Sequence, residues 1–167
     1  MDFDVIVKVI ADGAVIPVVL IGAYALLRYV PKGGRIAAYS RVLMAGLTAY
    51  LAAKLIASIY QPEALRPFEI LGVDPGASYL DNPGFPSDHA LFVTAITAAV
   101  WFETRKKGIA LLLVTLTLLV CIGRVIALVH TPLDIIGGVS IALFGALWYS
   151  NQPIRAKGVK RDGKSNR

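Results

Sequence analysis

Hydrophobic residues dominate this chain, and charged residues interrupt them at few places. Five blocks contain no Asp, Glu, Lys or Arg, and they cover residues 13–27, 42–53, 90–102, 108–123 and 135–154. Only the last block reaches the roughly 20 residues that an α-helix needs to cross the hydrocarbon core of a bilayer. We therefore expect the other helices to extend over flanking charges that snorkel or face the bundle interior.

This pattern predicts an all-α integral membrane bundle with about five transmembrane helices. The composition agrees, because 56% of the residues are hydrophobic and only 17% are charged. A soluble helical bundle is the alternative, but its helices would normally carry a charged face. We expect one membrane-embedded domain over residues 1–150 and a basic, disordered tail over residues 151–167. The single cysteine, Cys121, excludes an intramolecular disulfide and is interpreted as a packing residue.

Two interpretations of residues 1–12 remain open. Their apolar positions suit a short amphipathic helix lying on the outer membrane surface, and equally suit the start of the first transmembrane helix. The segment lacks the basic region of a cleavable signal, so we expect no processing.

The distribution of charge predicts the orientation in the membrane. Thirteen Lys or Arg residues and two acidic residues lie in the connection 28–41, the turn 103–107 and the tail. The opposite side holds four Lys or Arg residues and nine acidic residues. By the positive-inside rule the first set is cytoplasmic, which places the N-terminus outside and the tail inside. The four basic residues of the acidic, outer side are Lys8, Lys54, Arg66 and Arg124.

The first candidate cluster is the sequence Gly-Phe-Pro-Ser-Asp-His at residues 84–89. Glycine and proline break the chain before an apolar helix, and Ser87 is placed to cap it. The amides of such a helix start bind anions, and His89 follows two residues later. The alternative is a capped helix start with an interfacial histidine.

The second cluster contains Arg124, His130 and Asp134. Thr131 and Pro132 predict a helix start, which would put Asp134 about one turn beyond His130. The carboxylate could then reach back to the imidazole, fix its tautomer and raise the basicity of the other ring nitrogen. Arg124 would present its planar guanidinium to phosphate oxygens at the same membrane face. The structural alternative is a simple ion pair between Arg124 and Asp134.

These residues, together with Lys54 and the pair Arg66-Pro67, resemble the three signature motifs of the type-2 phosphatidic acid phosphatase superfamily. The quoted motifs are Lys54…Arg66-Pro67, Pro86-Ser87-Asp88-His89 and Arg124-x5-His130-x3-Asp134. The resemblance covers roughly residues 54–138.

Three features depart from the family pattern. Eleven residues separate Lys54 from Arg66, more than in the family's first motif. Gly123 stands where the third motif usually has serine, which removes a possible hydroxyl contact. Asp88 replaces a glycine, as in the variant found among bacterial undecaprenyl-pyrophosphate phosphatases.

The resemblance implies a phosphatase mechanism without metal or cofactor. His130 would attack phosphorus and form a phosphohistidine, Asp134 would orient it, and His89 would act as the general acid and then the general base. The resemblance assigns binding of the phosphate oxygens to Arg66, Arg124, Ser87, the amides near Asp88, and Lys54.

The resemblance and the charge distribution together predict a multi-pass protein of the inner (plasma) membrane with its site on the extracytoplasmic face. Undecaprenyl pyrophosphate is the expected substrate, with phosphatidylglycerol phosphate and phosphatidate as alternatives. The expected partners are the bilayer and a phosphorylated lipid, with no nucleic acid, and the sequence indicates no oligomeric state. Competing hypotheses are an ion channel or transporter, a structural membrane protein, and a vanadate-dependent haloperoxidase.

Overall fold

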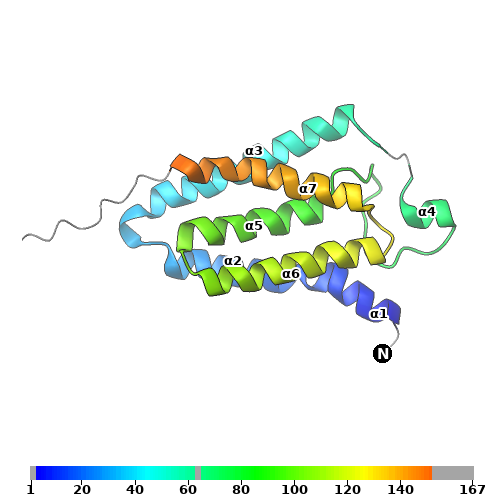
Figure 1. Ribbon diagram of the computed structural model, residues 1–167, viewed down its shortest axis with the longest axis horizontal. Helices are drawn as coiled ribbons and strands as arrows, with labels where there is room; N and C mark the ends of the chain where they lie inside the picture. Colours follow the sequence, from blue (N-terminus) through cyan, green and yellow to red (C-terminus); the bar gives the residue numbers. More distant parts are fainter. Residues whose placement is uncertain (1–2, 63–64, 152–167) are drawn as a thin grey trace, which may run out of the picture.

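The computed structural model describes residues 3–62 and 65–151, and every regular element within these ranges is helical. The elements are α1 (Phe3–Lys8), the π-helical turn η1 (Val9–Gly13), α2 (Val15–Tyr29), the 3₁₀ turn η2 (Lys32–Gly34), α3 (Arg35–Ile59), α4 (Pro67–Leu71), α5 (Asp88–Thr104), α6 (Lys107–Ile126), α7 (Pro132–Gly145) and the 3₁₀ turn η3 (Ala146–Asn151). As far as residue 151, where the described part of the last block ends, the five apolar blocks lie in the five long helical segments of one bundle (Figure 1), so the predicted all-α class is confirmed. Residues 152–167 of the predicted tail lie outside the described ranges.

Within the described ranges, four helical segments are long and apolar enough to cross a membrane. They are Phe3–Tyr29, Lys32–Ile59, Lys107–Ile126 and Pro132–Ser150. The remaining predicted helix is α5, which holds the apolar block 90–102. It has 17 residues, which is the lower limit for a spanning helix. It lies in the middle of the bundle and contacts α2, α3, α6 and α7 (Figure 1). These segments are those of a multi-pass membrane protein.

Large apolar side chains cover the outside of the bundle. Leu20, Leu55, Leu111 and Ile136 are each at least 60% exposed, and they lie on α2, α3, α6 and α7 respectively. A water-soluble protein rarely exposes contiguous apolar surface of this extent. The outer surface is therefore suited to contact with lipid chains.

The N-terminal segment continues directly into the first long helix, which favours the second of the two sequence interpretations. Helix α1 continues through η1 into α2 as one helical segment, Phe3–Tyr29. Within η1 the Ala14 amide donates to the Val9 carbonyl at 3.0 Å, the i to i+5 bond of a π-helix. The extra residue rotates the preceding part of the helix by about 100° relative to a regular α-helix.

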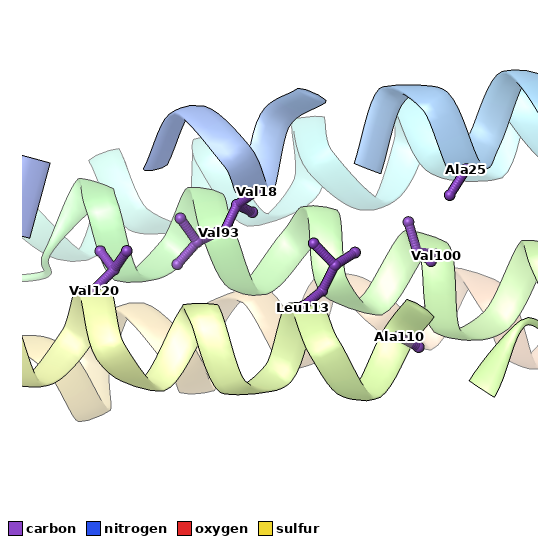
Figure 2. Close-up of a cluster of buried hydrophobic side chains, with 7 residues drawn as sticks. All are labelled: Val18, Ala25, Val93, Val100, Ala110, Leu113 and Val120. Atoms are coloured by element: carbon purple, nitrogen blue, oxygen red, sulfur yellow. The ribbon is translucent and has the colours of Figure 1, made fainter. Parts of the chain in front are cut away.

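Small side chains allow the helices to approach closely. Val18, Val93 and Val120 meet between α2, α5 and α6 in the core cluster that Figure 2 shows. At Gly145, even one methyl group would overlap the Ala45 carbonyl oxygen of α3. Close backbone packing of this kind stabilises helix association in membranes, where the hydrophobic effect between helices is weak.

A partly buried ion pair ties α3 to α5 at the end of the bundle away from the candidate site. The Arg41 guanidinium donates to both carboxylate oxygens of Glu103 at 2.6 and 2.7 Å. The Glu103 side chain is only 4% exposed. Two-point bonding of this kind compensates the desolvation of both charges.

Candidate active site

The predicted site residues meet at one end of the bundle, where α5 and α7 begin and α6 ends (right in Figure 1). A cavity of about 150 Å³ lies there. The predicted residues that line this cavity are Arg66, Asp88, His89, Arg124 and His130. Residues 78–80, 82–84 and 86 of the connection between α4 and α5 complete its wall.

The start of α5 is packed directly onto the start of α7. Ser87 is fully buried, and its hydroxyl accepts from the Ala90 amide at 3.4 Å, which is the N-cap predicted from the sequence. The Ser87 amide donates to the Asp134 carbonyl at 3.0 Å. A side chain at Gly138 would place its Cβ 2.5 Å from the Ser87 carbonyl oxygen, so only glycine allows this contact. The packing brings His89 and His130 to the same cavity.

His130 and Asp134 form the contact that their spacing predicts. The imidazole Nδ1 lies 3.3 Å from Asp134 Oδ2. The same oxygen accepts from the Thr131 amide at 2.8 Å, and the Thr131 hydroxyl accepts from the Asp134 amide at 3.2 Å. This capping box holds the Asp134 carboxylate in place independently of its contact with His130. With Nδ1 as the donor, Nε2 keeps its lone pair.

The surroundings of His130 favour its neutral form. Only 5% of the residue is exposed, and this burial lowers the pKa of its imidazole below the ordinary value of 6.5. The hydrogen bond to Asp134 raises the pKa, and the positive charges of Arg124 and Arg66 lower it. A neutral imidazole is the form that can attack an electrophile.

Arg124 lies in the last turn of α6 and is 1% exposed. Its Nη1 donates to Asp12 Oδ1 at 2.8 Å, and within the described residues its buried Nε has no hydrogen-bond partner. Asp12 comes from η1, far away in the sequence, and the motif analysis did not include it. The only sequence signal was an acidic residue next to an apolar block, which in a membrane helix suggests function.

Arg66 joins the connection between α4 and α5 to the residue before His130. Its guanidinium donates to the Val129 carbonyl at 2.5 Å. It also donates to the Leu80 carbonyl and to both oxygens of Asn82, at 3.0 to 3.2 Å. Arg66 therefore organises the cavity wall in addition to lining it, and its predicted role in phosphate binding stays a prediction.

Lys54 reaches the second motif despite its long spacing from Arg66. Helix α3 extends to Ile59, and Lys54 Nζ lies 3.1 Å from both carboxylate oxygens of Asp88. Both side chains are about 40% exposed, so the pair contributes little to stability. In the part of the chain that the structure describes, neither Lys54 nor Ser87 lines the cavity. Their predicted phosphate contacts stay predictions.

Comparison with known proteins identifies the family. Residues 36–157 match the PAP2 superfamily, and this range contains all three motifs and well over half of the chain. No curated protein and no solved structure gave a match. The chain therefore belongs to the PAP2 superfamily.

Proposed function

We propose that this protein is a membrane phosphatase that hydrolyses a phosphorylated lipid through a phosphohistidine on His130. The observation that carries the proposal is the buried His130–Asp134 pair on a cavity that Arg124 and His89 also line. A polarised imidazole, a second histidine and a cation are the groups that phosphoryl transfer through histidine needs. Membership of the PAP2 superfamily supports lipid phosphatase activity independently.

The size of the cavity supports a substrate that is only partly enclosed. Its volume of about 150 Å³ suits a phosphate group. It is well below the roughly 300–1,000 Å³ of pockets that enclose whole small-molecule ligands. The rest of the substrate stays outside, and the apolar outer surface of the helices suits a hydrocarbon chain that remains in the bilayer.

In the first step, His130 Nε2 attacks phosphorus and the bond from phosphorus to the leaving oxygen breaks. Asp134 accepts the Nδ1 proton in a hydrogen bond and stabilises the positive charge that develops on the ring. Burial and the charge of Arg124 lower the pKa of His89 to about 4 in the protein without substrate, and the negative charge of a bound phosphate opposes this shift and favours the protonated form. In the step, protonated His89 gives a proton to the leaving oxygen, which departs as the dephosphorylated lipid or as a lipid monophosphate.

In the second step, water hydrolyses the phosphohistidine. His89, now neutral, takes a proton from the water as the oxygen attacks phosphorus, and the bond to His130 Nε2 breaks. Inorganic phosphate leaves and both histidines return to their starting forms. Arg124 and Arg66 stabilise the charge on the equatorial oxygens, with Lys54 acting through Asp88. The scheme uses no metal ion.

Among phosphorylated lipids, the proposed substrate is undecaprenyl pyrophosphate, which would be converted to undecaprenyl phosphate on the extracytoplasmic face. Two sequence features support this choice: Asp88 in place of glycine in the second motif, and the excess of basic residues on the opposite side. Phosphatidylglycerol phosphate and phosphatidate are the alternatives, because no described contact selects a lipid tail.

The test of activity is phosphate release by detergent-purified protein from these three lipids, with and without EDTA. We expect release that EDTA leaves unchanged and that His130→Ala lowers by several orders of magnitude. Thermal unfolding of the variant serves as the folding control. Full activity of a folded His130→Ala protein would remove His130 as the nucleophile, and loss of activity with EDTA would contradict the metal-free scheme.

The test of orientation uses single cysteines in a Cys121→Ala background. Asp74→Cys lies at an exposed position of the connection between α4 and α5, and Lys32→Cys, also exposed, is the matched control in the connection between α2 and α3. We expect an impermeant thiol reagent to label position 74 in intact cells and position 32 only after lysis. The reverse pattern would place the site in the cytoplasm and exclude the proposed substrate.

A further inference from the structure

Asp12 is a partly exposed carboxylate that contacts two separate parts of the candidate site. Its Oδ1 accepts from Arg124 Nη1 at 2.8 Å, and its Oδ2 accepts from the Ser78 amide at 2.9 Å. Arg124 and Ser78 both line the cavity, from α6 and from the connection between α4 and α5 respectively. One carboxylate therefore bridges the phosphate-binding arginine to the segment that covers it.

Two local features bring Asp12 to this position. Asp12 lies in η1, where the inserted residue changes the direction in which the helix presents its side chains. The backbone of η1 also lies directly against α6, because a Cβ at Gly123 would be 3.0 Å from both Ala11 Cα and Ala11 N. Ala11 itself is fully buried.

Gly123 is the position where this chain departs from the third motif of the family, and the structure accounts for the departure. The residue immediately before Arg124 has no side chain, and the N-terminal helix fills the space. The same approach places a carboxylate from that helix on Arg124. The N-terminal segment thus supplies, through Asp12, a polar contact near Arg124 where the motif has lost its serine hydroxyl.

We propose that Asp12 is a positioning residue for phosphate binding, acting through Arg124 and the Ser78 segment. The proposal rests on the phosphatase function proposed above. A guanidinium has five N–H donors in one plane, and a contact to Nη1 fixes the direction of the others. The buried Nε lacks a partner among the described residues, so it is a donor that substrate oxygens can engage.

The experiment compares Asp12→Asn with Asp4→Asn in the full chain. Asp4 is an exposed carboxylate on the same helical segment, so it is a matched control for loss of one negative charge. Both Asp12 oxygens accept hydrogen bonds, so asparagine, which has a single acceptor oxygen, can keep only one of the two. We expect Asp12→Asn to lower kcat/KM roughly ten- to a hundredfold through loss of the charge and of one bond, and Asp4→Asn to leave it unchanged.

A double-mutant cycle separates positioning from a general structural role. Arg124→Lys keeps the charge but cannot bond Asp12 and phosphate with one planar group. In that background we expect Asp12→Asn to cause no further loss, because its effect passes through Arg124. An equal loss in both backgrounds, or no loss in the wild-type background, overturns the proposal.

Gly123→Ala provides a second variant that leaves both charges in place. Its methyl group pushes η1 away from α6, so we expect a similar fall in kcat/KM that is not additive with Asp12→Asn. Unchanged kcat/KM in Gly123→Ala also overturns the proposal.

Binding of inorganic orthovanadate gives a readout that does not depend on turnover. We expect orthovanadate to raise the thermal unfolding temperature of the wild-type protein, and to raise that of Asp12→Asn much less. Equal protection of both overturns the proposal. An active His130→Ala protein would instead refute the proposed mechanism, and the difference in orthovanadate protection would still test Asp12.

Discussion

Replacing Asp134 by asparagine tests how the structure controls the tautomer of His130. One oxygen, Asp134 Oδ2, accepts from both the Thr131 amide and His130 Nδ1. An asparagine has one oxygen and one nitrogen to place there. The Thr131 amide is a fixed donor, so the asparagine oxygen must take the Oδ2 position, where it still accepts from Nδ1.

The magnitude follows from this geometry. Asp134→Asn keeps the hydrogen bond and the tautomer of His130, and loses only the negative charge. Hydrogen bonds to a charged group contribute about 1.5–3 kcal/mol and neutral ones about 0.5–1.5 kcal/mol. The difference of about 1–1.5 kcal/mol corresponds to a loss of roughly tenfold in kcat/KM.

Asp134→Ala removes the acceptor altogether. The loss then includes the whole charged hydrogen bond and control of the tautomer, so we expect a reduction of roughly a hundredfold or more. Thr131→Val is the matched control for helix capping, because it removes only the hydroxyl that bonds the Asp134 amide. It should lower the free energy of unfolding by about 1 kcal/mol and leave the His130 contact in place.

The assay is phosphate release from a lipid pyrophosphate, with thermal unfolding measured on every variant. Equal losses in Asp134→Asn and Asp134→Ala would refute the inference that a shared oxygen sets the tautomer. A tenfold loss in Thr131→Val would show instead that helix capping dominates.

Three further predictions concern other features of the fold. Burial keeps the pKa of His130 below 6.5, so the acid limb of kcat/KM should lie below pH 6.5 and move lower still in Asp134→Asn; a limb above pH 6.5 contradicts this. Glu103→Ala breaks the partly buried ion pair far from the site and should lower the free energy of unfolding by about 1–3 kcal/mol with kcat/KM unchanged, because the Arg41 side chain left behind is 18% exposed; a large kcat/KM effect would show coupling between the ends. Gly138→Ala forces a methyl group toward the Ser87 carbonyl and should lower kcat/KM by roughly an order of magnitude, while an unaffected enzyme would show that this spacing is unimportant.

The helical class was predictable because each apolar block is much longer than the uncertainty in where its helix begins and ends. Charged residues at helix ends, such as Arg35, Arg41 and Lys54, lie within α3 as expected for flanking charges that extend a short apolar block. The contact of His130 with Asp134 was predictable for a similar reason. It depends on one turn of helix and on a cap that Thr131 and Pro132 encode locally.

Contacts between distant segments were not predictable from one sequence. Nothing local indicates that Asp12 meets Arg124, because the contact needs the π-helical turn and the close approach at Gly123. Similarly, the bonds from Arg66 to the carbonyls of Val129 and Asn82 depend on how the connection between α4 and α5 folds over the end of the bundle.

The sequence by itself determined the all-helical membrane class, the helix caps and the pairing of His130 with Asp134. These follow from hydrophobic periodicity and from side chains within one helical turn, which local geometry governs. The tertiary structure alone decided which donors surround the cavity, that the N-terminal helix contributes a carboxylate to it, and that α5 lies at the centre of the bundle. These depend on backbone approach between segments remote in sequence, where a glycine or an inserted residue sets the distance.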